Sequence, residues 1–159
     1  MIIWYQRTKR ATGQSKMTDA VLNLDMNCHR IPFELNFTFL LSISKLLYKI
    51  FKNKEKKIYF VPSRSNFGIF KDLPILLLCF LNFHVIGHLH GTDAISFLNL
   101  TIKLPIIGRL YKKIDFISPS QIMTLKLRNM GYSCITIENF GELATQKPTD
   151  KIVQTIANL

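Results

Sequence analysis

The chain has 159 residues, of which 48% are hydrophobic and 19% are charged, and this composition excludes an intrinsically disordered protein. Domains commonly contain about 100 to 150 residues, so the length predicts a single domain with a sizeable core. Twenty-one Lys and Arg residues against ten Asp and Glu give a net charge of +11, which favours an anionic partner.

Neither a membrane span nor a secretory signal is predicted. The densest apolar stretch, residues 73–87, is interrupted by a proline, an asparagine and a histidine, whereas a spanning helix needs about 20 predominantly apolar residues. The N-terminus has no apolar core of signal-peptide length. The three cysteines form neither a disulfide framework nor a CxxC metal motif. We therefore expect a cytoplasmic protein.

The first part of the chain predicts a strand, two helices and an irregular segment. Residues 2–6 (IIWYQ) are apolar enough for a short strand. Residues 15–24 predict a helix with Ser15 as its N-cap, because their apolar side chains share one face. Residues 25–36 have no clear period and are predicted to be irregular. Residues 38–52 carry lysines among apolar residues and predict an amphipathic helix.

From residue 56 onward, strands and helices are predicted to alternate. Apolar runs with no polar break are typical of strands buried on both faces. Ser118 or Ser120 is placed to cap a helix that Gly131 ends. The alternation predicts a Rossmann-like α/β fold, a parallel sheet flanked by helices with right-handed crossovers. The predicted strands are 56–63, 83–90, 113–118 and 132–139. The predicted helices are 68–82, 93–103, 118–131 and a weak one over 150–159. Pro105 breaks the helix predicted over 93–103, and a short segment follows it.

The loops at the carboxyl ends of these strands are polar. In parallel sheets, ligands bind at that edge. Three of the four loops carry Ser or Thr beside groups that can bind phosphate or sugar hydroxyls. The loops are PSRSN, HGTD, SPSQ and ENFGE. Together they predict an anion-type or sugar-type ligand.

The HLH sequence at residues 88–90 has three interpretations: a metal site, an acid/base pair, or a strand that runs into a loop. Residues two apart on a strand face the same side, so both rings could reach one ion. A catalytic zinc needs about three protein ligands, however, and no carboxylate cluster is present apart from Asp93. We expect no metal. His88 is predicted to pack in the sheet, and His90 to meet a ligand beside Gly91.

The basic clusters favour a membrane surface over nucleic acid. KNKEKK, at residues 52–57, follows the amphipathic helix directly, and Lys112 and Lys113 follow a second apolar stretch. Apolar side chains beside lysines suit an anionic membrane. No zinc-finger, helix-turn-helix or RNA-binding pattern is found. A loop with Gly13, Gln14, Ser15 and Lys16 ahead of the first helix could bind an anion or be an ordinary capped loop.

The order of these pieces resembles the N-terminal, acceptor-side domain of family 4 glycosyltransferases, which have the GT-B fold of two Rossmann-like domains. The resemblance covers residues 12 to about 143. It depends on a Gly loop before a helix, a His-Gly loop after a strand, a strand that ends in Ser before a helix ending in Gly, and a strand ending in an Asn turn. The matching segments are TGQSKMTDAVLNL, IYFVPSRSNFGIFKDLPILL, VIGHLHGTDAISF, KIDFISPSQIMTLKLRNMG and ITIENF.

This resemblance implies sugar transfer from a nucleotide-sugar, with retention of configuration and without a metal or other cofactor. His90 would be the catalytic-loop histidine near the transferred sugar. The implied acceptor is lipid-linked or a polysaccharide, and the domain would lie on the inner face of the membrane. The residues expected near the donor are Gly13, Gln14, Ser15 and Gly91, and those expected to bind substrate are Ser63, Arg64, Ser65, Asp93 and Ser118.

The donor-binding half of the family pattern is not found in this sequence. The Glu-x7-Glu motif of the donor domain is absent, since Glu34, Glu55, Glu138 and Glu142 have other spacings. We expect residues 1–145 to form the Rossmann-like domain, with a clipped first strand, and 146–159 to be a tail or the start of a linker. Either the sequence is a fragment of a longer protein or a separately encoded partner supplies the donor domain, and the domain would be inactive alone. The alternative is a non-catalytic protein that binds membrane surfaces, and nucleic-acid binding ranks last.

Overall fold

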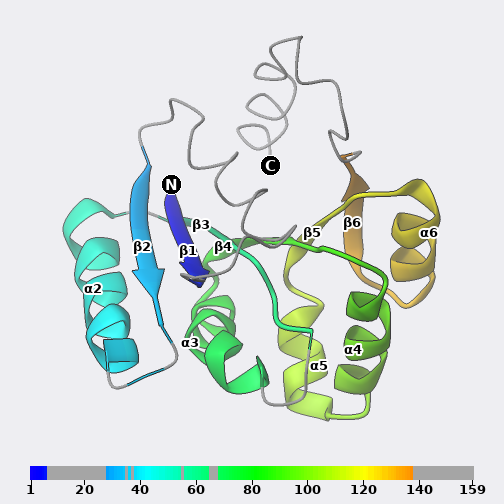
Figure 1. Cartoon of the computed structure of the whole chain (residues 1–159), viewed down its shortest axis with the longest axis horizontal. Helices are drawn as coiled ribbons and strands as arrows, with labels where there is room; N and C mark the ends of the chain where they lie inside the picture. The colour runs from blue at the N-terminus through cyan, green and yellow to red at the C-terminus, as the bar shows by residue number, and fades with distance from the viewer. Residues whose placement is uncertain (7–27, 35, 37, 55, 65–67, 138–159) are drawn as a thin grey trace, which may run out of the picture.

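A computed structural model describes residues 1–6, 28–34, 36, 38–54, 56–64 and 68–137. It confirms the predicted α/β fold, with one sheet of six parallel strands in the order β2-β1-β3-β4-β5-β6 (Figure 1). The strands are β1 (Ile2–Gln6), β2 (His29–Phe33), β3 (Lys57–Phe60), β4 (His84–His88), β5 (Asp115–Ser118) and β6 (Ser133–Thr136). The described helices are α2 (Thr38–Asn53), α3 (Gly68–Phe80), α4 (Asp93–Ile102), α5 (Pro105–Tyr111) and α6 (Gln121–Asn129).

Two elements differ from the prediction. Residues 25–36 were expected to be irregular, but β2 occupies part of that segment and pairs with β1 along five residues. Pro32 hides this strand in the sequence, and it is tolerated because β2 is an edge strand. The short segment after Pro105 is the helix α5, in which Pro105 takes the first position, where a missing N–H is harmless. The helices predicted over 15–24 and 150–159, and the tail from 146, lie outside the described residues.

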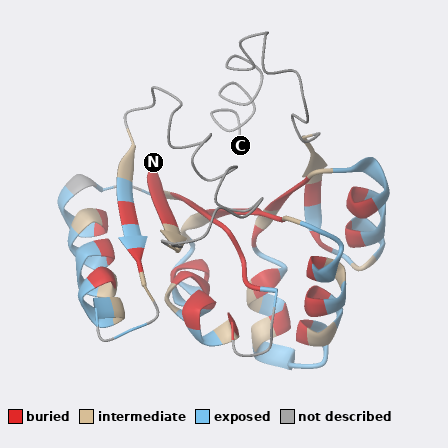
Figure 2. Cartoon of the chain, in the orientation of Figure 1, coloured by how far each residue is buried: buried red, intermediate tan, exposed pale blue. Residues whose placement is uncertain are grey.

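All five described helices pack on one face of the sheet. From β2 to β6 every connection passes to a strand further along in the same direction, and right-handed crossovers then place the connecting helices on the same side. The larger core cluster joins this helical layer to one side of the strands. On the opposite face, a smaller cluster of strand residues contains Ile3, Tyr59, Ile86 and Ile117, which are also buried (Figure 2).

Helix α6 confirms both caps predicted from the sequence. The Ser120 side chain accepts a hydrogen bond from the Met123 backbone N–H at 3.3 Å, which satisfies one of the free donors of the first turn. At the other end, Gly131 has φ +82°, and the N–H groups of Gly131 and Tyr132 donate to the carbonyls of Arg128 and Leu127. These two hydrogen bonds together form a Schellman motif. The helix therefore ends where glycine allows a left-handed backbone conformation.

Gly87 is the fourth of the five residues of β4, where Phe116 and Ile114 leave no room for a side chain. A Cβ at this position would come within 2.8 Å of Cε1 and 2.9 Å of Cδ1 of Phe116, and within 3.0 Å of Cγ2 of Ile114. Phe116 is fully buried, so its ring has little space into which to move. Close packing of β4 against β5 therefore depends on glycine at position 87.

We predict that Gly87→Ala lowers the free energy of unfolding by about 1–3 kcal/mol, because the added methyl group overpacks the core against the Phe116 ring. Urea denaturation of the variant and the wild type measures the difference. In a Phe116→Leu background the alanine should be better tolerated, since the ring atoms it would meet are gone. Equal losses in both backgrounds would contradict the assigned contact.

Candidate functional site

Four of the residues predicted to form the site meet at the carboxyl ends of β3 and β4. Arg64 follows β3, and its Nη1 donates to the Asp93 Oδ2 at 3.2 Å and to the His90 carbonyl at 3.4 Å. Asp93 is the first residue of α4, where a carboxylate also interacts favourably with the helix dipole. The guanidinium thus joins the loop after β3 to the loop after β4.

Gly91 allows this close approach. Its φ is +75°, in the region that favours glycine, and a Cβ there would lie 3.3 Å from the Arg64 Nη1 and 3.5 Å from the Asp93 Oδ1. The side chains of Arg64 and Asp93 remain 41% and 63% exposed. An ion pair so open to solvent contributes little to stability, so both groups can be contacted by a ligand.

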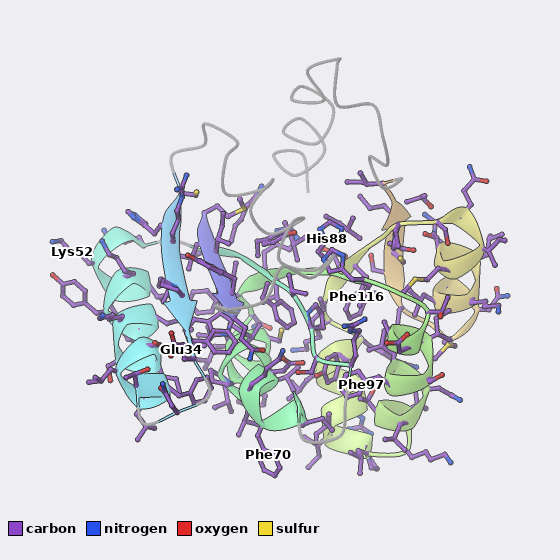
Figure 3. All side chains as sticks on the ribbon, in the orientation of Figure 1. Glu34, Lys52, Phe70, His88, Phe97 and Phe116 are labelled. Carbon is purple, nitrogen blue, oxygen red and sulfur yellow. The ribbon has the colours of Figure 1, made fainter. Side chains whose placement is uncertain are left out.

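Beside this ion pair, two histidines form a stack, of which His88 is buried and His90 is half-buried. The rings of His88 and His90 lie with centroids 4.5 Å apart and planes 28° apart. His88 is buried in the sheet, as predicted, and its Nδ1 lies 2.6 Å from the Tyr59 hydroxyl on the neighbouring strand. Figure 3 shows His88 on the side of the sheet away from Phe97 and Phe70 of the helical layer. The stack therefore belongs to the face that the described helices do not cover.

Both imidazoles are uncharged at neutral pH. Burial, with a smaller effect from His90, lowers the pKa of His88 to about 3. Burial, with a smaller effect from the Arg64 charge, lowers the pKa of His90 to about 4. Neutral imidazole carries one N–H donor and one lone-pair acceptor. The pair can therefore bind hydroxyl groups or, at His90, accept a proton.

A second polar group, buried beneath the loop after β3, was not found from the sequence. Asp72, in α3, accepts hydrogen bonds from the Ser63 N–H and the Tyr111 hydroxyl, both at 2.8 Å. The adjacent Lys71 donates to the Gln6 Oε1 at the end of β1, at 3.1 Å. These contacts fix the start of the loop that carries Arg64. The only sequence signal was a Lys-Asp pair that interrupts an apolar helix.

The remaining predicted site residues lie elsewhere or make internal bonds. The Ser63 hydroxyl donates to the Gly68 carbonyl at 2.9 Å and is buried. The Ser118 hydroxyl donates to the Ser120 carbonyl at 3.0 Å, so it supports the turn into α6. Gly13, Gln14, Ser15 and Ser65 lie outside the described residues. The structure thus brings together Arg64, His90, Gly91 and Asp93 at one edge and uses the two buried serines to shape the loops.

Among the described residues, no group of three or more His, Cys, Asp or Glu side chains is arranged to hold a metal ion. His84, on the same face as His88, is at the amino end of β4 and pairs with Asp115 at 2.8 Å. It is therefore separated from the stack by the length of the strand.

No protein-family model, no curated protein and no solved structure matches this chain.

We predict that Asp72 lowers stability as the pH rises. Burial raises its pKa from 3.8 to about 6. Between these two pH values the unfolded chain releases the Asp72 proton while the folded protein keeps it. The unfolded state is therefore stabilised relative to the folded state as the pH rises. Relative to Asp72→Asn, which cannot ionise, the wild type should lose on the order of 3 kcal/mol of unfolding free energy between pH 4 and 7.

Urea denaturation at a series of pH values measures this difference. Asp93→Asn, at an exposed carboxylate, controls for the change in formal charge. Parallel stability profiles for the wild type and Asp72→Asn would show that Asp72 does not titrate as a buried acid.

Proposed function

We propose that this domain is the acceptor side of a retaining sugar transferase, which moves a sugar from a nucleotide-sugar to a lipid-linked or polysaccharide acceptor. The observation that carries this proposal is the meeting of Arg64, His90, Gly91 and Asp93 at the carboxyl edge of a parallel sheet. That edge is where open α/β sheets bind nucleotides and their conjugates. The ordered resemblance to the GT-B acceptor domain adds the reaction class.

The strand order gives further support. The chain passes from β1 to β2 on one side and then returns to β3 on the other, so the order reverses between β1 and β3. Ligands of such sheets bind in the crevice outside the strand ends at this reversal. Gln6 ends β1, and Arg64 follows β3. The proposed site lies beside the reversal, on the loops after β3 and β4.

In this proposal each residue has a role that suits its chemistry. The uncharged ring of His90 forms hydrogen bonds with the transferred sugar. The Arg64 guanidinium, with several donors in a fixed plane, contacts a phosphate or hydroxyl of the substrates. Gly91 lets the substrate approach the backbone. The roles near the donor phosphates that the resemblance implies for Gly13, Gln14 and Ser15, which lie outside the described residues, are part of this proposal, and a separately encoded domain binds the rest of the nucleotide-sugar.

We predict that co-expression with a donor-binding domain of a family 4 glycosyltransferase yields transfer of labelled sugar to membrane extract, and that His90→Ala lowers the rate at least about 100-fold, as expected for a residue that stabilises the transition state. His29→Ala is the matched control, because His29 begins β2 at the opposite edge of the sheet. A reconstituted pair in which His90→Ala is as active as the wild type would overturn the role of His90.

A second candidate function is binding to an anionic membrane surface without catalysis. Helix α2 presents an apolar stripe to solvent, in which Leu40 is 66% and Phe51 79% exposed. Lys45 and Lys52 are exposed on the same helix, and the Lys52 ammonium lies over the Tyr48 ring. Apolar side chains flanked by lysines are the pattern of a helix that lies in the headgroup region. No helix within the described part of the chain is long and apolar enough to cross a bilayer.

We predict that the protein sediments with vesicles containing phosphatidylglycerol and not with pure phosphatidylcholine. Leu40→Ser combined with Phe51→Ser should weaken this partition roughly tenfold or more, because buried CH2 groups and lysines together hold such helices. Ile122→Ser, at an equally exposed apolar residue on α6, is the control and should bind like the wild type. Equal binding to both kinds of vesicle would contradict the charge component, and unchanged binding of the double variant would contradict the α2 surface.

A further inference from the structure

Two buried nitrogen atoms in the histidine stack have no hydrogen-bond partner. They are the Nε2 atoms of His88 and His90, and they are the buried side-chain polar atoms left unpaired within the described part of the chain. An unpaired buried polar group is unfavourable, and native structures satisfy the great majority of such groups. Two such atoms on adjoining rings at a ligand edge therefore indicate a place where another molecule supplies the missing bonds.

The Tyr59 hydroxyl determines which proton His88 carries. Burial raises the pKa of Tyr59, so the phenol keeps its proton. The hydrogen bond found for that hydroxyl within the described residues is the one to the His88 Nδ1, at 2.6 Å. If the imidazole donated instead, the phenol proton would have no acceptor among the residues that the structure describes. Tyr59 must then donate to Nδ1, and a neutral His88 carries its own proton on Nε2.

The resulting stack presents a defined pattern to a ligand. The His88 Nε2–H is a donor, and the His90 Nε2, on a ring whose centroid lies 4.5 Å from that of His88, is the second nitrogen without a partner. A hydroxyl group, which donates and accepts at once, can satisfy both kinds of atom. Within the described part of the chain, the ion pair found beside the stack is the one between Arg64 and Asp93.

An anion or a metal ion fits this pattern less well. A phosphate on the two Nε2 atoms would lose its hydration against two uncharged rings, and the Arg64 charge beside them is already shared with Asp93. A bound zinc would need about three or four protein ligands, and the described residues offer no such group. An uncharged hydroxyl-bearing ligand is the class that the stack recognises.

We propose that His88 is a second ligand-binding residue beside His90, that its Nε2–H donates to a hydroxyl group of the sugar, and that Tyr59 is a positioning residue which holds His88 in the required tautomer. The identification of the hydroxyl compound as a sugar rests on the proposed function. The tautomer follows from the hydrogen bond between the Tyr59 hydroxyl and the His88 Nδ1, with both groups uncharged, and it does not depend on the identity of the ligand.

Long-range 1H–15N spectra of protein with labelled histidines test the tautomer directly. The chain has four histidines, so His29 and His84 serve as internal references away from the stack. We expect His88 to carry its proton on Nε2 in the wild type and to populate the Nδ1–H form in Tyr59→Phe, while the His84 signals stay unchanged. A wild-type His88 protonated on Nδ1 would overturn the role of Tyr59.

Titration of the same sample with methyl glycosides of glucose, galactose and mannose tests the ligand class. We expect at least one of them to shift the Nε2 resonances of both His88 and His90, and inorganic phosphate to leave them in place. His88→Leu should lower the affinity for that glycoside at least tenfold. His88→Gln, which keeps a hydrogen-bond donor, should lower it less. Shifts from phosphate alone, or no shift from any glycoside, would overturn the proposal.

The failure of this inference is distinguishable from failure of the proposed function. If the reconstituted pair transfers sugar and His88→Leu does not change the rate, the proposed role of His88 is contradicted and the transferase function is supported. If glycosides bind to the stack but no reconstituted pair transfers sugar, the sugar-binding site is supported and the proposed transferase function is contradicted.

Discussion

The right-handed crossover between parallel strands is the constraint on which the other features depend. Because the chain advances in one direction from β2 to β6, the described helices cover one face, and all carboxyl ends meet at one edge. Residues 26 positions apart in the sequence, Arg64 and His90, are thereby brought within hydrogen-bonding distance. The same topology places Tyr59 and the histidine stack on the face of the sheet that the described helices do not cover.

Polar groups in the interior of this sheet fall into two classes. The Asp72 group is satisfied by Ser63 and Tyr111, and it fixes the loop that carries Arg64. The His88 and His90 stack is satisfied on one side only, through Tyr59. A satisfied buried group gives rigidity, whereas an unsatisfied one at a ligand edge carries binding capacity. The difference between these two groups separates the supporting residues from those that we propose to contact the sugar.

Much of the fold and part of the site followed from the sequence. The strands and helices between residues 38 and 137 were predicted correctly apart from α5, and the convergence of Arg64, His90, Gly91 and Asp93 follows from the rule that parallel strand ends share an edge. Strand β2 was missed because Pro32 breaks the pattern that an interior strand would show. The pairing of Tyr59 with His88 depends on the register of β3 against β4, and one sequence contains no measure of that register. Ser63 and Ser118 were expected at the ligand surface, but their hydroxyls form hydrogen bonds within the loops.

A crystal structure of the chain with a bound methyl glycoside tests the central claim most directly, since it locates the sugar and its contacts together. The account predicts a sugar at the carboxyl edge of β3 and β4, with one hydroxyl within about 3 Å of the Nε2 atoms of His88 and His90. A sugar bound elsewhere, or ordered water on both nitrogens in the presence of saturating sugar, would contradict it.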